Sequence, residues 1–456
     1  MTTWIDGFLE QNEELAGREV ARSTHATHFE LGGGVRRAVI TAAPQHFRSA
    51  QGWQAYDLGL RQDAAARWGA PGAAVRLAPD GTLSFSEGSA YQQRTRSVGV
   101  LADGEYTPLA QLPDGRAVGS SLRRETGVFC HELTLTEHGV KESLILSAAP
   151  DGVERSGYLV YETVHRGNAQ GLLFSPGSAV DAEGRFFAVH HFSVEGTEFT
   201  GLAMEDVARA SFPLVIDPSV FFGAVSDGNI AGYATNYYVA RSTSVSYDVG
   251  TADMYIGQAY ESAIPRYYAF RSLLKFSLAS LNLLAEIYAA NLHLACMGDS
   301  SALADFDLQI VKQNWAPQDP LSNGNREAAY DGCLAGAADA VWRNTSGLST
   351  GVLLPSPPLD ISWLAPGATA YYSLRSSRDA AGNLPPANGN EYVRLASGLH
   401  GTLAMRPALV VDYFAVPSAT GTLVQPSPRV RLQDARIKLR ARRRKTLLAA
   451  ERITGG

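Results

Sequence analysis

The sequence contains little cysteine. Its 456 residues include only Cys130, Cys296 and Cys333. Such a small, odd number excludes a framework of disulfide bonds. Cys296 and Cys333 fall in the same part of the chain and could pair with each other, but a free cysteine more often serves as a small buried apolar residue. We therefore expect free thiols.

The sequence also lacks long apolar runs and several common catalytic motifs. No stretch of about 18 apolar residues occurs, so we expect no membrane-spanning helix. The first ten residues, MTTWIDGFLE, have neither a basic segment nor a long apolar core, and we expect no secretory signal. There is no HExxH zinc motif, no paired CxxC and no Walker loop. Because nothing singles out the two facing carboxyl groups of a glycosidase, we expect a protein that is not an enzyme.

Turn-forming and aromatic residues are plentiful. The 44 glycines and 22 prolines are dispersed along the chain, and tyrosine and phenylalanine together number 36. This composition is typical of many short strands joined by turns. With 45% hydrophobic and 18% charged residues, the chain can bury cores for two or three domains. The composition predicts a mostly β, multidomain protein.

Charge is distributed unevenly. Residues 429–452 hold ten basic and two acidic residues, a local charge of +8 that leaves −14 on the rest of a chain whose total is −6. Residues 418–428, rich in proline, serine and threonine, predict a linker. We predict that residues 429–456 form an assembly arm, extended or partly helical, that docks on an acidic surface of another subunit. Nucleic acid is a less favoured partner because no DNA-binding motif accompanies the charge. The arm residues that carry this prediction are Val430, Leu432, Ile437, Leu439, Arg440, Arg442, Arg443, Arg444 and Lys445.

The spacing of apolar residues predicts a helix and several hairpins. Hairpins are expected at residues 28–40, 77–83, 133–146 and 180–187, where glycine-containing turns separate apolar runs. Residues 1–22 place apolar and acidic side chains at helical spacing and predict an amphipathic helix. That helix either packs on its own domain or anchors the protein to a neighbour. A helical turn is expected at residues 278–284.

Three strand-like segments lie in the second half of the chain. They are Arg271–Phe276 (RSLLKF), Ala290–Leu294 (ANLHL) and Pro407–Tyr413 (PALVVDY), with turn-rich sequence between them. Together they resemble the DNRLRE-type jelly-roll domain of bacterial surface and phage proteins. The resemblance implies a jelly-roll β-sandwich at residues 219–417 that acts as a structural or adhesive module. Its expected core comprises Leu274, Phe276, Leu292, Leu294, Leu409 and Val411.

The preceding region is similar to the same family in three further places. They are Pro44–Asp57, Gly139–Leu146 (GVKESLIL) and Pro213–Pro218 (PLVIDP), with Phe47 where the family pattern has tyrosine. They resemble the segment that often precedes DNRLRE-type domains. The resemblance implies an N-terminal β domain at residues 23–218, preceded by the helix or anchor at residues 1–22.

Candidate ligand-binding residues form no compact motif. His190 and His191 are adjacent and would point to opposite faces of a strand, so we expect them to be core or solvated rather than metal ligands. We expect no cofactor, with a structural calcium ion as an alternative, because oxygen ligands recur without EF-hand spacing at Asp299, Asp305, Asp307, Asn323 and Asn325.

Tyrosines on a sheet face can stack on sugars or anchor a protein interface. Many of them gather in the expected jelly roll, where some must serve the core. They are Tyr233, Tyr237, Tyr238, Tyr255, Tyr260, Tyr267, Tyr268, Tyr371 and Tyr372.

These features favour a non-catalytic structural component of a phage virion, in the tail, neck, baseplate or capsid decoration, with a host-surface glycan adhesion role. A surface-type domain pair without a secretion signal is typical of a particle assembled in the host cytoplasm and released by lysis. The expected partners are other virion subunits, copies of the same chain in a homo-oligomer, and a cell-surface glycan. Two alternatives are an extracellular bacterial carbohydrate-binding adhesion protein and a polysaccharide-degrading enzyme.

Overall fold

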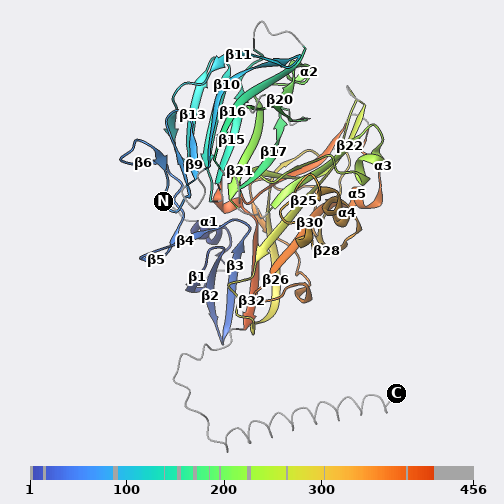
Figure 1. Ribbon diagram of the computed structural model, residues 1–456. Helices are drawn as coiled ribbons and strands as arrows, with labels where there is room; N and C mark the ends of the chain where they lie inside the picture. The colour runs from blue at the N-terminus through green and yellow to red at the C-terminus, as the bar shows by residue number, and fades with distance from the viewer. Residues whose placement is uncertain are drawn as a thin grey trace, which may run out of the picture. The chain divides into compact units, whose positions relative to one another are not determined.

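The computed structural model describes residues 4–13, 17–85, 91–137, 139–150, 156–167, 172–183, 185–194, 197–222, 227–262, 265–301, 303–386 and 389–414. Residues 1–415 form one compact unit. The expected linker and the basic assembly arm lie outside the described residues. Antiparallel strands dominate the described part (Figure 1), which confirms the predicted mostly β class.

Two sheets, of nine and seven strands, form a first sandwich over residues 61–222. The nine-stranded sheet contains β6 (Arg61–Gln62), β7 (Trp68–Gly69), β8 (Val75–Leu77), β9 (Leu83–Phe85), β10 (Gln92–Ala102), β11 (Glu105–Gln111), β16 (Tyr158–Arg166), β19 (His190–Val194) and β20 (Thr197–Ala203). The other contains β12 (Arg116–Val118), β13 (Ser121–Thr126), β14 (Phe129–Leu135), β15 (Gly139–Leu146), β17 (Leu172–Val180), β18 (Phe186–Phe187) and β21 (Leu214–Phe222). Val98 and Leu159 of one sheet pack against Leu144 and Ile216 of the other, so the core lies between the layers.

A second sandwich combines residues 18–41 with residues 227–414 in 14 connected strands. Its strands are β1 (Arg18–Arg22), β2 (Ala26–Gly32), β3 (Val35–Thr41), β22 (Asp227–Ala234), β23 (Ser246–Asp248), β24 (Asp253–Glu261), β25 (Arg266–Ser277), β26 (Glu286–Asp299), β27 (Asp307–Lys312), β28 (Ala337–Asn344), β29 (Leu353–Pro355), β30 (Thr369–Ser376), β31 (Asn390–Ala396) and β32 (Ala408–Phe414). β26 pairs with β32 along residues 286–293 and with β31 along residues 296–299, and a bulge lies between Cys296 and Gly298. β26 thereby connects the two layers, because a bulge bends the strand that carries it.

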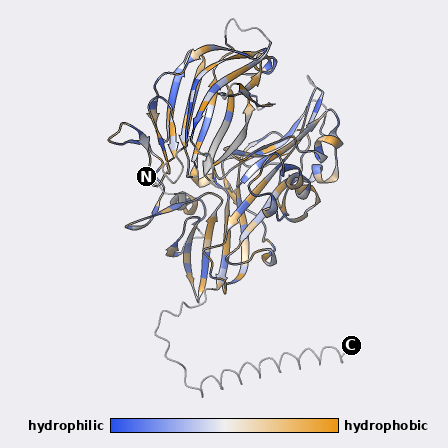
Figure 2. Ribbon diagram, in the orientation of Figure 1, coloured by the Kyte–Doolittle hydropathy of each residue, from blue (hydrophilic) through white to orange (hydrophobic). Residues whose placement is uncertain are grey.

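The predicted core of this sandwich is confirmed. All six residues are fully buried in one hydrophobic cluster, to which both layers of the sandwich contribute side chains. They are Leu274, Phe276, Leu292, Leu294, Leu409 and Val411. Figure 2 shows apolar and polar residues alternating along many strands, as expected when one face of a sheet is buried.

The structure differs from the expected division of the chain at residues 18–41. The sequence places most of this segment in the N-terminal β domain, whereas β3 pairs with β32 in the second sandwich. Ala38 and Ile40 are buried in the same core as Leu409. Arg37 also donates to both carboxylate oxygens of Asp412, at 2.6 and 2.8 Å. These contacts give β32 a partner on each side.

The N-terminal helix is shorter than the sequence predicts. α1 spans Trp4–Gln11, and residues 18–22 form strand β1, so the helical prediction is wrong for that stretch. β1 pairs with β2, and such cross-strand contacts can outweigh a helical pattern. Phe8 is fully buried, and its ring centroid lies 5.5 Å from that of His293, so α1 packs on the second sandwich.

The remaining helices are short, and the predicted hairpins are present. The helices are α2 (Met204–Arg209), α3 (Tyr237–Ser242), α4 (Arg326–Ala335) and α5 (Ser377–Ala381), with 3₁₀ turns η2 (Ala316–Gln318), η3 (Ile361–Trp363) and η4 (Leu403–Met405). Pairs β2–β3, β8–β9, β14–β15 and β17–β18 confirm the four hairpins, and β4 (His46–Ser49) with β5 (Gly52–Ala55) adds another. Residues 278–284 hold isolated turns instead of a helical segment. No helix in the described ranges has the length and apolar character needed to cross a membrane.

Candidate functional site

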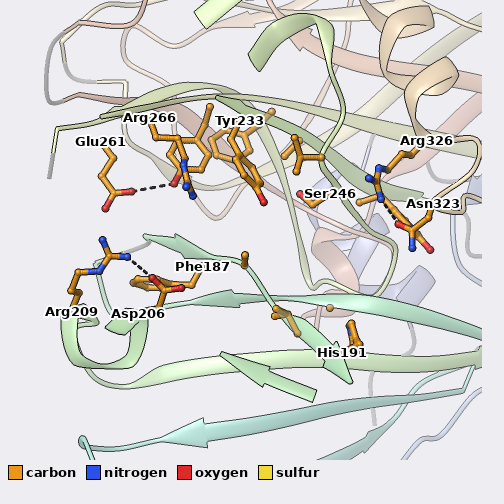
Figure 3. Close-up of a pocket in the computed structure, with 18 residues that line it drawn as sticks. Phe187, His191, Asp206, Arg209, Tyr233, Ser246, Glu261, Arg266, Asn323 and Arg326 are labelled. Atoms are coloured by element: carbon orange, nitrogen blue, oxygen red, sulfur yellow. Dashed lines mark hydrogen bonds and ion pairs between the residues drawn. The ribbon is translucent and has the colours of Figure 1, made fainter. Parts of the chain in front are cut away.

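A hollow of about 250 Å³ lies between the two sandwiches, next to the contact of β17 with β23. We call it the aromatic hollow. The first sandwich contributes β18, β19 and α2 to its walls, and the second contributes β22, β23, β24, β25 and the start of α4. Figure 3 shows the two walls facing each other. The lining residues discussed below are Phe187, Asp206, Arg209, Tyr233, Tyr247, Glu261, Arg266, Tyr268, Phe270, Asn323 and Arg326.

Aromatic rings cover the wall formed by the second sandwich. Tyr268 and Phe270 are two residues apart on β25 and therefore point to the same face. Their rings are stacked, with centroids 5.9 Å apart and an angle of 7° between the planes. Tyr233 of β22 is the direct cross-strand partner of Tyr268, with ring centroids 5.8 Å apart. The local pairing of β22 with β25 thus builds a row of rings.

Charged groups flank these rings. The Arg266 guanidinium carbon lies 4.8 Å from the centroid of the Tyr233 ring, a cation–π arrangement. Tyr268 donates its hydroxyl to Glu261 at 3.1 Å, and Glu261 pairs with Arg266 across the strands. Burial, together with the Glu261 carboxylate, raises the pKa of the Tyr268 hydroxyl, which stays protonated as a donor.

The opposite wall carries its own ion pair. Asp206 and Arg209 are three residues apart on α2 and form a salt bridge. Phe187, largely buried on β18, lies beside them (Figure 3). This wall therefore adds a ring and two hydrogen-bonding groups to the hollow.

The far end of the hollow is formed by Arg326 and Asn323. Arg326 donates to the Asn323 side-chain oxygen and, at 3.4 Å, to the Ser244 carbonyl. Burial raises the pKa of the neighbouring Tyr247, although the Arg326 charge opposes that change. Asn323 and Ser244 are both neutral, so these two hydrogen bonds leave the charge of the guanidinium unpaired.

The lining suits a ligand with both apolar and hydroxyl-bearing faces. Tyrosine and phenylalanine rings offer apolar contact, and the arginines and carboxylates offer directed hydrogen bonds. Such a mixture in a concave site is typical of small-molecule recognition. Both carboxylates already have partners: Asp206 pairs with Arg209 and Glu261 accepts from Tyr268.

The histidines do not form a site together. His28 bonds the Tyr413 hydroxyl at 2.9 Å, and His191 bonds the Thr200 hydroxyl at 2.9 Å. His138 lies outside the described residues. Across the described ranges, no group of three or more histidine, cysteine, aspartate or glutamate side chains is placed to hold a metal ion.

One histidine belongs to a buried polar network inside the first sandwich. His131 contacts Glu142 at 2.7 Å, and Thr95 and Gln93 donate to the same carboxylate at 2.6 and 2.8 Å. Burial alone would raise the pKa of Glu142, but the hydrogen bonds and the charge of His131 hold it below its usual range. Both side chains are at least 96% buried, so the network is closed to solutes.

The expected oxygen ligands for calcium are occupied by protein partners. Asp299 accepts from Ser301, Asp305 accepts from Thr345, and Asp307 accepts from Asn344. Asn325 bonds two backbone carbonyls before α4, and only Asn323 lines the aromatic hollow. These residues therefore do not converge on one point.

Some of the tyrosines named from the sequence are buried in the core, and others line the aromatic hollow. Tyr237 and Tyr372 are buried in core clusters, whereas Tyr238 is 60% exposed outside the hollow. Tyr233 and Tyr268 line the hollow. Arg266 and Arg326 were not among the residues predicted from the sequence. The alternation in Arg266-Tyr-Tyr268-Ala-Phe270, which is typical of a strand, places Arg266, Tyr268 and Phe270 on one face and indicates Arg266.

Two further predictions concern the cysteines and the arm residues. The three cysteines are free, as expected. The arm residues from Val430 to Lys445 lie outside the described residues. A GxSxG pattern at residues 347–351 lies in turns between β28 and β29, not at a strand-to-helix elbow, and so lacks the setting of a hydrolase nucleophile.

Comparison with known proteins gives little guidance. No family model matches the chain, and no curated protein matches it. Among solved structures, the crystal structure of an infectious bursal disease virus VP2 subviral particle aligns at 12% sequence identity, over 91% of this chain and 83% of that chain. The TM-score is 0.11, so this alignment carries no argument about the fold or the function of the chain. The resemblance to DNRLRE-type domains therefore stays a prediction.

Proposed function

We propose that the protein is a non-catalytic structural component of a phage virion that adheres to a host-surface glycan through the aromatic hollow. The observation that carries the adhesion role is the row formed by Tyr233, Tyr268 and Phe270 beside Arg266 and Glu261. A sugar ring has apolar C–H faces and hydroxyl edges, and this lining offers a partner for each.

The carboxylates of the hollow favour binding over hydrolysis. A glycosidase needs one carboxyl group free to donate a proton and another free to attack or to activate water. Asp206 is held by Arg209, and Glu261 accepts from Tyr268 while facing Arg266 across the strands. Both groups therefore serve better as fixed hydrogen-bond acceptors.

The virion role rests on the sequence. Its supports are the resemblance to DNRLRE-type modules and the basic residues 429–456, which are expected to reach a neighbouring subunit. The alternative is an extracellular bacterial adhesion protein. Mass spectrometry of gradient-purified phage particles separates the two, because a virion component is recovered with the capsid proteins and an adhesin is recovered with bacterial material.

A glycan array tests the adhesion role. We expect the full chain to bind a subset of glycans and Tyr233→Ala to lose that binding. Tyr238→Ala, which removes an exposed ring outside the hollow, should bind like the parent. An array without any bound glycan contradicts the adhesion role.

The same glycans test for catalysis. We expect no new reducing ends after prolonged incubation with the purified protein. Turnover that disappears in Glu261→Gln or Asp206→Asn would instead establish a polysaccharide-degrading enzyme.

A further inference from the structure

The charges around the aromatic hollow are not balanced. Arg209 is paired with Asp206, and Arg266 faces Glu261 across β24 and β25. Arg326 has no carboxylate within salt-bridge distance among the residues that the structure describes. The carboxylate of its neighbour Glu327 accepts from the Ser244 amide at 2.6 Å and forms no salt bridge with Arg326. Among the described residues, the guanidinium at the far end of the hollow therefore has no carboxylate bonded directly to it.

The position of Arg326 is fixed by its surroundings. It opens α4, and its bonds to Asn323 and to the Ser244 carbonyl hold it at the edge of the hollow. The Arg326 guanidinium has five N–H donors, and these two neutral acceptors use only some of them, so the others are available to a ligand. A fork of parallel N–H groups matches the two oxygens of a carboxylate.

The size of the hollow limits the ligand. Its volume of about 250 Å³ is smaller than the roughly 300–1,000 Å³ of pockets for drug-sized ligands. A hollow of that size suits one sugar ring better than several. The tyrosine row offers a surface for that ring, with Glu261 and Asp206 as acceptors for its hydroxyl groups.

We propose that the aromatic hollow binds the terminal residue of an acidic glycan, a carboxylated sugar whose carboxylate meets Arg326 while its ring packs on the tyrosine row. This inference rests on the proposed glycan-binding function and adds the class of sugar. A neutral sugar of the same shape leaves the Arg326 charge without a partner and binds more weakly.

Calorimetric titration of the full-length protein tests the inference. The two probes are an oligosaccharide that ends in glucuronic acid and the matched oligosaccharide that ends in glucose, which differ only in the terminal carboxylate. We expect the acidic probe to bind on the order of tenfold tighter or more, as for a hydrogen bond to a charged group. Arg326→Gln should bring the two dissociation constants together, and raised salt should weaken only the acidic probe.

A control variant and the array separate the possible failures. Arg116→Gln removes an exposed arginine of β12, whose side chain is 71% exposed, and should keep the preference for the acidic probe. Equal affinity for both probes, or a preference that survives in Arg326→Gln at an unchanged melting temperature, overturns the inference and leaves glycan adhesion standing. If no glycan on the array is bound, both the adhesion role and this inference fail.

Discussion

Arg271 shows how one buried charge can organise its surroundings. It belongs to the RSLLKF segment, is fully buried on β25 and donates to Asp379 of α5 at 2.7 Å. It also donates to the carbonyls of Tyr330 and Arg241, at 2.8 and 2.7 Å, and its guanidinium carbon lies 3.7 Å from the Tyr330 ring centroid. One side chain thus holds parts of α3, α4 and α5 on the sheet, so its role is structural.

Replacing this arginine should be costly. Arg271→Gln leaves the buried Asp379 carboxylate without its main partner, and we expect a loss of about 3–5 kcal/mol in the free energy of unfolding. Arg394→Gln is the matched control, because its 42% exposed side chain pairs with Asp253 and such pairs contribute less than about 1 kcal/mol. Urea denaturation of both variants measures the difference, and equal losses would contradict the structural role.

Asp227 predicts a pH dependence of stability. Burial raises its pKa to about 6, even though the Gly398 amide donates to it. A carboxyl group whose pKa is higher in the folded state binds its proton more tightly there. Its favourable contribution is therefore complete below the unfolded value near 4 and is lost as the pH rises through about 6.

Asp227→Asn should remove this dependence. We expect the variant to be about 1–3 kcal/mol more stable than the parent at pH 8 and close to it at pH 4. Thermal or urea unfolding at several pH values measures the effect. A stability difference between the two proteins that does not change with pH would show that the pKa of Asp227 is the same in the folded and unfolded states.

At the scale of elements, local patterns predict hairpins but not distant partners. The β14–β15 and β17–β18 hairpins follow from alternating residues around turns. The pairing of β3 with β32 joins Arg37 to Asp412, 375 positions away, and neither segment encodes its partner in its own pattern. The residues of the aromatic hollow are likewise only partly predictable from local sequence. Tyr233 and Tyr268 stand out as aromatic residues, whereas Arg266 and Arg326 resemble ordinary surface arginines until the fold brings them to one cavity.

The pairing of β3 with β32 changes what is expected of an isolated jelly roll. A fragment of residues 219–417 lacks β1–β3 and leaves an edge of β32 unpaired. We expect this fragment to be partly unfolded or aggregated, because exposed edges recruit other strands. Co-expression with residues 17–45 should restore a soluble, cooperatively folding complex, as judged by size-exclusion chromatography and circular dichroism. A stable fragment without that segment would show that β1–β3 are dispensable.

At the scale of the whole chain, the compact unit of residues 1–415 contains a buried link between its two sandwiches. Arg406, just before β32, donates to Glu137, in the turn between β14 and β15, at 2.7 Å. Their side chains are 6% and 4% exposed. Separating a buried ion pair costs free energy, because each charge would remain buried without its partner. The Arg406–Glu137 pair therefore helps to hold the two sandwiches together.

Residues 429–456, the predicted assembly arm, lie outside the described residues and lead to a prediction about the complete protein. We expect deletion of residues 429–456 to leave the melting temperature nearly unchanged and to abolish incorporation into particles or oligomers. The reason is that like charges from Arg440 to Lys445 repel one another unless an acidic surface faces them. Calorimetry and sedimentation of the truncated and full-length chains measure both effects. Normal assembly without the arm, or a loss of the fold, would contradict this role.

The junction of β3 with β32 also sets an order of events during synthesis. Ribosomes add about 5–20 residues per second, so β3 emerges roughly 20–75 s before its partner has been translated. During that interval β3 pairs only with β2, so its other edge and its apolar residues Ala38 and Ile40 are open to chaperones or to other nascent chains. The second sandwich can close only as translation of the described chain ends, and slower elongation lengthens the time in which its first strands are unprotected.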